Sequence, residues 1–203
     1  MDASEWDERY AGSELVWSAE PNSFVAAECA GLEPGVAVDL AAGEGRNAIW
    51  LARRGWSVTA VDFSRVALGK GRRLAGDADV SWVCADATTW RPDAPVDLVV
   101  IAYLQVPAAD RRAAVTGAVR SLRPGGTLLW VSHDTTNLTE GTGGPQDPAV
   151  LMTAADVVHD VRSTGLPVEV QRAERVARLV GSADHRGEER RTAWDALVRV
   201  VRN

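Results

Sequence analysis

The chain has 203 residues, of which 46% are hydrophobic, and its formal net charge at pH 7 is −6. This length can bury one substantial core, so residues 1–203 are expected to form a single domain. The acidic charge disfavours a general nucleic-acid-binding protein, no stretch is long and apolar enough to span a membrane, and the start lacks a signal-peptide pattern. Cys29 and Cys84 do not suggest a metal site or a disulfide framework. We therefore expect a cytoplasmic monomer or homodimer whose partner is a small molecule, with no nucleic acid and no membrane.

Apolar runs alternate with helical patterns along the chain, which is typical of βαβ units and a parallel sheet. Residues 1–30 are rich in aromatic side chains and are predicted to form a cap ahead of a core over residues 31–203. Two long alternating segments, residues 168–180 and 192–201, are predicted to form an antiparallel pair at the sheet edge. The other strands are predicted at Val36–Leu40, Ser57–Val61, Val80–Cys84, Leu98–Ala102 and Thr127–Ser132, and the helices at Arg46–Arg54, Arg65–Leu74, Ala109–Leu122 and Ala149–Ser163.

The most informative segment is VDLAAGEGRNAIWLA, residues 38–52, which joins an apolar strand to a glycine turn and then to a helix. Gly43 and Gly45 allow a tight turn and a close approach of the backbone to a ligand. This arrangement is typical of a site for a nucleotide-derived cofactor. The carboxylate of Asp39, just before the glycines, favours a cationic or hydroxyl-bearing ligand over a pyrophosphate.

Acidic residues stand at the ends of three consecutive predicted strands, at Asp39, Asp62 and Asp86. Ligands of open parallel sheets bind beyond the carboxyl ends of the strands, so these acids are expected to converge on one crevice. Asp62 follows Gly43 by 19 residues, a spacing that suits the ribose hydroxyls of a nucleotide-derived cofactor. Phe63 is then placed to cover one face of an adenine, and Asp86 to accept from its amino group. The alternative is that these acids only cap the helices that follow.

These ordered motifs resemble those of class I S-adenosylmethionine-dependent methyltransferases, and most of all those of the tellurite-resistance and thiopurine methyltransferase-like group. The resemblance rests on DLAAGEGRNAIWLA, VDFS, ADA, DLVVIAYL and LRPGGTLLWV, in that order, and on WDERYAG near the start. It implies a doubly wound α/β fold with a mostly parallel seven-stranded sheet of order 3-2-1-4-5-7-6, helices on both faces and a C-terminal antiparallel hairpin. It also implies S-adenosyl-L-methionine as the cofactor and S-adenosyl-L-homocysteine as its product.

The resemblance also implies roles for individual residues. Gly43 and Gly45 would lie under the methionine part of the cofactor, and Asp62 would hold its ribose. Asp86 with Ala87 would contact the adenine, while Ala102 and Tyr103 would line the floor near the sulfonium. In the family, the first small residue of this turn is often a glycine, whereas this chain has Ala41 there. The remaining candidate cofactor residues are Asp39, Ala41, Arg46, Asn47 and Phe63.

Two other functions fit parts of the pattern. Residues 43–48 read G-x-G-x-x-A, as in dinucleotide-dependent oxidoreductases. Such a site holds a pyrophosphate at the start of a helix, where Asp39 and Glu44 would repel it. S-adenosylmethionine has no phosphate and carries a sulfonium cation. The second alternative is a regulatory module that binds S-adenosylmethionine without catalysis.

The acceptor of the methyl group is expected to be a small molecule, and its nucleophilic atom is left open. A soft sulfur, selenium or tellurium anion would need alignment and little general base, whereas an oxygen or nitrogen nucleophile would need a base more clearly. Residues 102–105, after the fourth strand, read AYLQ. They lack the Asp/Asn-Pro-Pro-Tyr-type tetrad of many amino- or base-methylating enzymes.

Candidate catalytic residues are His133, after the fifth strand, and His185, in the loop between the last two strands. The alternative is that these histidines are exposed polar residues without a catalytic role. The aromatic side chains near the start would close over the substrate as a lid, or else fasten the terminus to the core. Candidate substrate-binding residues are Trp6, Tyr10, Trp17 and Arg186.

Overall fold

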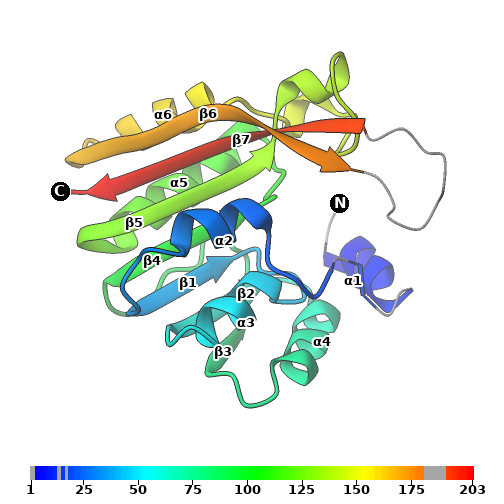
Figure 1. The fold of residues 1–203 in the computed structure, drawn as a ribbon, viewed down its shortest axis with the longest axis vertical. Coiled ribbons are helices and arrows are strands. Elements are labelled where there is room, and N and C mark those ends of the chain that lie inside the picture. The colour runs from blue at the N-terminus through cyan, green and yellow to red at the C-terminus, as the bar shows by residue number, and fades with distance from the viewer. Residues whose placement is uncertain (1–2, 13–14, 17, 181–190) are drawn as a thin grey trace.

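The computed structural model describes residues 3–12, 15–16, 18–180 and 191–203. Seven strands form one sheet of order β3-β2-β1-β4-β5-β7-β6, which confirms the expected topology (Figure 1). Strands β1 to β5 are parallel, and β7 runs antiparallel between β5 and β6. The strands are β1 (Val36–Leu40), β2 (Ser57–Asp62), β3 (Val80–Cys84), β4 (Val96–Ala102), β5 (Leu122–His133), β6 (Val168–Val180) and β7 (Arg191–Arg202).

Helices cover both faces of the sheet, as expected for a doubly wound fold (Figure 1). On one face α5 (Ala108–Ser121) and α6 (Ala154–Arg162) pack against the sheet, and on the other face α2 (Ser23–Cys29) and α3 (Arg46–Ala52) do. The short helix α1 (Ala3–Ala11) packs against α4 (Arg65–Ala75), which lies beside β3. Among the described residues, no helix combines the length and the apolar character needed to cross a membrane.

Alternation along β1 decides which way its acidic residue points. Val38 and Leu40 belong to the core under α5, whereas Ala37 belongs to the core under α3. Successive side chains of a strand point to opposite faces, so Asp39 lies on the α3 face with Ala37. The strand therefore presents its carboxylate to the helix that follows the glycine turn.

The helix predicted at residues 149–163 is interrupted. A short 3-10 turn covers Pro148–Val150, and α6 begins only at Ala154. Thr153 forms a capping box: its Oγ1 accepts from the backbone N–H of Asp156, and the Asp156 carboxylate accepts from the backbone N–H of Thr153 at 2.8 Å. Such a box fixes the start of a helix, which explains why α6 does not extend further back.

Strand β5 begins at Leu122, five residues before the predicted start, and α5 ends at Ser121. Leu122 pairs with Val96 of β4, and the ladder then shifts before Leu98 pairs with Thr127. Four residues of β5, 123–126, thus lie opposite the single residue Asp97 of β4 and bulge from the ladder around Gly125, whose φ is 83°. The Pro-Gly-Gly run therefore interrupts the pairing with β4, but β5 begins before it.

Candidate active site

The carboxyl ends of β1, β2, β4 and β5 meet at one edge of the sheet, beside α1 (Figure 1). The turn after β1 contains three residues with positive φ: Ala41 at 58°, Gly43 at 56° and Gly45 at 77°. Glycine adopts such angles readily, whereas an L-alanine there is strained by about 1–2 kcal/mol. Ala41 therefore adopts the positive-φ conformation that a glycine would adopt at this position of the turn, and this conformation is strained for alanine.

We expect Ala41→Gly to stabilise the protein by about 0.5–1 kcal/mol, because relief of left-handed strain exceeds the greater backbone entropy that glycine loses on folding. Chemical denaturation of the purified variant measures this change. Ala42→Gly is the matched control, since Ala42 has a negative φ. The Ala42→Gly protein should lose about as much stability as the Ala41→Gly protein gains. An equal loss in both variants would show that no strain is stored at residue 41.

Gly45 serves a packing role as well as a conformational one. A Cβ on Gly45 would overlap the indole of Trp82 in β3, and a Cβ on Gly71 in α4 would overlap the same ring. Trp82 thus lies against both glycines and packs the glycine turn against α4. The sequence suggested only close approach to a ligand at Gly45.

Asp39 is fully buried beneath the start of α3. Its Oδ2 accepts from the backbone N–H of Ala48 at 3.1 Å, while its Oδ1 is buried and has no hydrogen-bond partner among the described residues. Burial raises the pKa of Asp39 to about 7, although the hydrogen bond from Ala48 opposes the rise. A buried carboxylate oxygen without a partner is stabilised by a hydrogen-bond donor or a nearby cation, so this acceptor fits a ligand that carries an ammonium group, with a sulfonium as a nearby second cation.

Asp62, at the end of β2, holds two backbone segments together. Its Oδ2 accepts from the N–H of Gly43 and its Oδ1 from the N–H of Ser64, each at 2.8 Å. Burial raises the pKa of this carboxyl, and the two hydrogen bonds oppose the rise. Each carboxylate oxygen can accept more than one hydrogen bond, so the contacts leave room for ribose hydroxyls.

The third strand-end acid, Asp86, is exposed and organises the turn after β3. Its Oδ1 accepts from the backbone N–H of Thr88 at 2.8 Å and from the Thr88 hydroxyl at 2.7 Å. Ala87 is buried in the core, and Phe63 is partly buried, with its carbonyl accepting from the Cys84 thiol at 3.4 Å. Asp86 thus holds a turn between β3 and β4, and in this described part of the chain no helix follows that it could cap.

Helix α1 is fastened to α4 beside the glycine turn. Asp7 accepts from the Ser64 hydroxyl and, at 3.3 Å, from the Val66 N–H. Lys70 of α4 donates to the Tyr10 carbonyl and lies 3.3 Å from a carboxylate oxygen of Glu44 in the turn. The segment that carries Trp6 and Tyr10, whose rings stack at 5.5 Å, is therefore tied to the turn through Lys70. Trp17 lies outside the described residues.

A chain of polar contacts runs from α3 to the C-terminal hairpin. Asn47 of α3 accepts from the N–H of Asn22, whose side-chain amide donates to the Tyr103 hydroxyl at 3.2 Å. Tyr103 donates in turn to Asp195 of β7 at 2.8 Å, and Arg178 of β6 donates to the same oxygen at 2.7 Å. These contacts bring residues far apart in the sequence to one place beside the carboxyl ends of β4 and β5.

Burial changes the pKa values of the residues in this chain of polar contacts. It raises the pKa of Tyr103, and the neighbouring Asp195 raises it further, so the phenol is neutral. Burial opposes ionisation of Asp195 as well, but contacts with His133 and Arg178 outweigh it and lower the pKa of Asp195. Arg46, at the start of α3, lies near Tyr103 and Asp39, and its pKa is lowered by burial. Tyr103 also has a φ of 62°, which is strained for a residue with a side chain.

His133, at the end of β5, is not the exposed histidine of the alternative reading, because only 15% of its side chain is accessible. Its Nδ1 lies 3.4 Å from Oδ1 of Asp195, and its ring lies 4.6 Å from that of Tyr103. Its backbone N–H donates to the Gln105 side chain at 3.0 Å. The other candidates from the hairpin loop, His185 and Arg186, lie outside the described residues.

Sequence reasoning missed Asp195, Arg178 and Asn22. Asp195 interrupts the apolar strand TAWDALVRVV on its inward face, and an acid in such a place is a signal that could have been noticed. Asn22 caps α2 by accepting from the N–H groups of Phe24 and Val25, and this cap precedes an unpredicted helix. Arg178 gives no comparable signal, since alternating basic residues are common on an edge strand.

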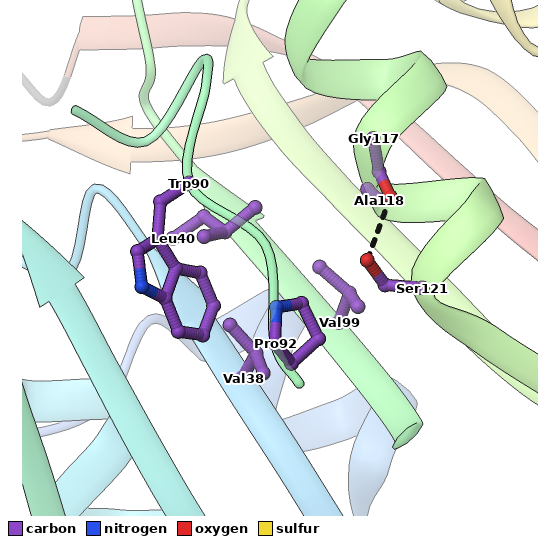
Figure 2. Close-up of a pocket in the computed structure, with 8 residues that line it drawn as sticks. All are labelled: Val38, Leu40, Trp90, Pro92, Val99, Gly117, Ala118 and Ser121. Atoms are coloured by element: carbon purple, nitrogen blue, oxygen red, sulfur yellow. Dashed lines mark hydrogen bonds between the residues drawn. The ribbon is translucent and has the colours of Figure 1, made fainter. Parts of the chain in front are cut away.

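A small apolar cavity lies apart from these residues, between β1, β4 and α5 (Figure 2). Its volume of about 10 Å³ is at most that of one water-sized sphere. Figure 2 shows Val38, Leu40 and Val99 of the sheet facing Trp90 and Pro92, so the cavity is a gap in the packing and not a substrate site.

Comparison with known proteins adds sequence and fold relationships. Residues 37–126 match a family model described as a methyltransferase domain. Over 94 residues the chain is 40% identical to demethylmenaquinone methyltransferase of Clavibacter sepedonicus, a match that covers 45% of this chain and 38% of that protein. The chain therefore spans well under half the length of this relative.

Solved structures share the fold over nearly the whole chain. N-methyltransferase NodS from Bradyrhizobium japonicum, in complex with S-adenosyl-L-homocysteine, has a TM-score of 0.69 at 19% identity, and the match covers 99% of each chain. TehB from Haemophilus influenzae has a TM-score of 0.73 at 14% identity, with 90% of this chain and 63% of that chain covered. By sequence, then, residues 37–126 match a methyltransferase domain, and by structure the chain has the fold of the class I S-adenosylmethionine-dependent methyltransferases.

Proposed function

We propose that the protein transfers the methyl group of S-adenosylmethionine to a small-molecule acceptor. The observation that carries the proposal is the buried Oδ1 of Asp39, which has no hydrogen-bond partner among the described residues and lies behind the glycine turn. This oxygen suits a cofactor with cationic groups and no phosphate, and it disfavours a dinucleotide. The methyltransferase-domain match over residues 37–126 supports the same chemistry.

The cofactor would lie along the carboxyl ends of β1 to β4. We propose that Asp39 and the turn hold its methionine part and that Asp62 holds its ribose, while Asp86 and Phe63 flank its adenine. Tyr103 would then border the methyl group. The full proposed set is Asp39, Ala41, Gly43, Gly45, Arg46, Asn47, Asp62, Phe63, Asp86, Ala87, Ala102 and Tyr103.

The cofactor supplies a methyl group on a sulfonium, which is already an activated leaving group. The protein then has to align the acceptor with that methyl group in a site that excludes water, and alignment of this kind can contribute about 7–11 kcal/mol. A soft acceptor atom such as sulfur, selenium or tellurium suits this chemistry. We propose such a soft acceptor atom for this protein, and we also propose that the protein belongs to the tellurite-resistance and thiopurine methyltransferase-like group.

The decisive experiment compares binding with turnover. We expect calorimetry to detect S-adenosylmethionine and S-adenosylhomocysteine binding but no NAD binding. A methyl-labelled cofactor should then label at least one member of a panel of thiols, phenols, selenite and tellurite. Saturable binding without any labelled product would favour the regulatory module, and preferential binding of NAD would favour the oxidoreductase.

Helix α1 is proposed to close over the bound cofactor as a lid, through Lys70 and its contacts with Glu44 and Tyr10. We expect Lys70→Met to weaken S-adenosylmethionine binding about three- to thirtyfold, because loss of the ammonium removes the contact that joins α1 to the buried Glu44 carboxylate of the turn. Calorimetry measures the affinity, and hydrogen exchange reports the opening of α1.

Arg73→Met is the control for this lid, since Arg73 is an exposed cation on the same helix. It should change neither measurement. If Lys70→Met increases exchange in α1 and leaves cofactor affinity and turnover unchanged, α1 only fastens the terminus to the core.

A further inference from the structure

The arrangement of His133 and Asp195 is fixed by the backbone as well as by their side chains. The two residues are directly opposite each other in the antiparallel pairing of β5 with β7. Asp195 is fully buried, and its carboxylate also receives hydrogen bonds from Tyr103 and Arg178. These two donors hold the carboxylate beside the imidazole, whose Nδ1 lies 3.4 Å from Oδ1 of Asp195 and has no other hydrogen-bond partner among the described residues.

The imidazole is also contacted by Tyr103 and by the loop that follows β5. The Tyr103 ring lies 4.6 Å from it at an interplanar angle of 33°. On the loop that follows β5, a Cβ on Gly144 would lie 2.7 Å from Cγ of His133, so only glycine lets that backbone pass so close. Since Nδ1 faces Asp195, Nε2 is the ring nitrogen left to meet another molecule.

We propose that Asp195 is a positioning residue that holds His133 with its proton on Nδ1, so that Nε2 accepts a proton from a methyl acceptor that arrives as a thiol or a phenol. This inference rests on the proposed function and deepens it. It selects acceptors that are weak acids, because a preformed oxyanion would give Nε2 no proton to accept.

A lone pair on the acceptor sulfur or oxygen forms a bond to the methyl carbon, and the bond between that carbon and the cofactor sulfur breaks. Its electron pair stays on the sulfur, which gives S-adenosylhomocysteine. The proton of the acceptor passes to Nε2 of His133, and the ionised Asp195 stabilises the resulting imidazolium.

The charges around His133 agree with a neutral acceptor. The groups that face it are Asp195 on β7, Arg178 on β6 and Tyr103 after β4, with Arg46 beyond Tyr103. Arg178 is matched by Asp195, with a second contact from its Nη2 at 3.4 Å, and Tyr103 is uncharged. The Arg178 cation is therefore already compensated by the carboxylate that holds His133.

The first test is spectroscopic and needs no turnover. Nitrogen-15 NMR of the imidazole rings, assigned with His133→Gln and His159→Gln, should show neutral His133 with its proton on Nδ1. Asp195→Asn should move the proton to Nε2, because an amide N–H can donate to Nδ1. Asp160→Asn is the matched control, since Asp160 is equally buried and is paired with Arg111 at 2.7 Å between α5 and α6.

The second test compares two acceptors at pH 7. An alkyl thiol such as 2-mercaptoethanol is mostly protonated, whereas 4-nitrothiophenol is mostly ionised. His133→Gln should lower kcat/KM for the alkyl thiol by roughly 10²- to 10⁴-fold and for the ionised thiol by less than about tenfold. His159→Gln, which changes an exposed histidine on α6, should leave both rates unchanged.

Each outcome decides the inference. It is overturned by a wild-type His133 with its proton on Nε2, by an equal loss with both thiols, or by methylation of neither thiol while S-adenosylmethionine binds. If Asp195→Asn does not fold, the wild-type tautomer and the thiol comparison still decide. Absence of cofactor binding counts against the proposed function instead, and the NMR result continues to test the role of Asp195.

Discussion

Asp39→Asn is expected to make the free protein more stable at pH 8 and to weaken S-adenosylmethionine binding about 10- to 100-fold. Burial raises the pKa of Asp39 from 3.8 to about 7, so ionising this group in the folded state costs up to about 4 kcal/mol above pH 7. The amide avoids that cost, although its NH₂ group has no partner here, which leaves an expected gain of about 1–3 kcal/mol. The affinity falls because a charge-assisted contact to the cofactor is lost.

The pH dependence of this effect has a defined sign. Below about pH 4, Asp39 is protonated in both the folded and the unfolded protein, and its contribution to stability is fully present. The contribution is lost progressively between about pH 4 and pH 7, so wild type and Asp39→Asn should have similar stabilities near pH 4 and differ fully by pH 8. Cofactor affinity of the wild type should increase over the same range, because the ionised carboxylate is the form that binds a cation.

Urea denaturation and calorimetry at several pH values measure both effects. Asp97→Asn is the control for affinity, since Asp97 accepts from the N–H of Val36 at the opposite end of β1. It should leave cofactor binding unchanged at every pH. A variant at Asp39 that binds the cofactor as tightly as wild type at pH 8 would remove the assignment of this carboxylate to the cationic part of the ligand.

Asp62→Ala is expected to lower the free energy of unfolding by about 1–3 kcal/mol and to weaken cofactor binding about 10- to 100-fold. The stability falls because the N–H groups of Gly43 and Ser64 both lose their acceptor in a buried place, and recovery of the cost of burying the carboxylate offsets part of the loss. The affinity falls because the ribose would lose a charged acceptor.

Asp62→Asn separates the two roles of this residue. The amide can still accept through one oxygen, so it should recover part of the stability, while a ribose diol that needs two acceptors should remain weakly bound. Denaturation and calorimetry on both variants give the comparison. Lower stability with wild-type affinity in Asp62→Ala would leave Asp62 as a structural residue of the turn and contradict its role at the ribose.

The sheet, and the edge at which the ends of its parallel strands meet, were predictable because their signals are local. The ends of consecutive parallel strands meet at one edge, so the order of Asp39, Asp62 and Asp86 in the sequence already implied their convergence. Helix starts were less predictable, because they depend on capping side chains that accept from backbone N–H groups two or three residues further along the chain. Thr153 and Asn22 fix the starts of α6 and α2 through such contacts.

The polar chain around Asp195 could not be predicted in the same way. It depends on the register of β7 against both β5 and β6, which places Asp195 opposite His133 and opposite Val176. A shift of one residue in that register would turn Asp195 to the other face of the sheet. Periodicity predicts that such a hairpin forms, but it does not determine which residue of one strand faces which residue of another.

The contact between Trp82 and two glycines has a consequence for how this site can change over evolution. Gly45 and Gly71 belong to different elements, yet the same indole occupies the space that a side chain at either position would need. A larger residue at one glycine becomes tolerable only after the indole has been replaced by a smaller side chain. Substitutions at these three positions are therefore expected to be accepted in a fixed order, with the tryptophan changing first.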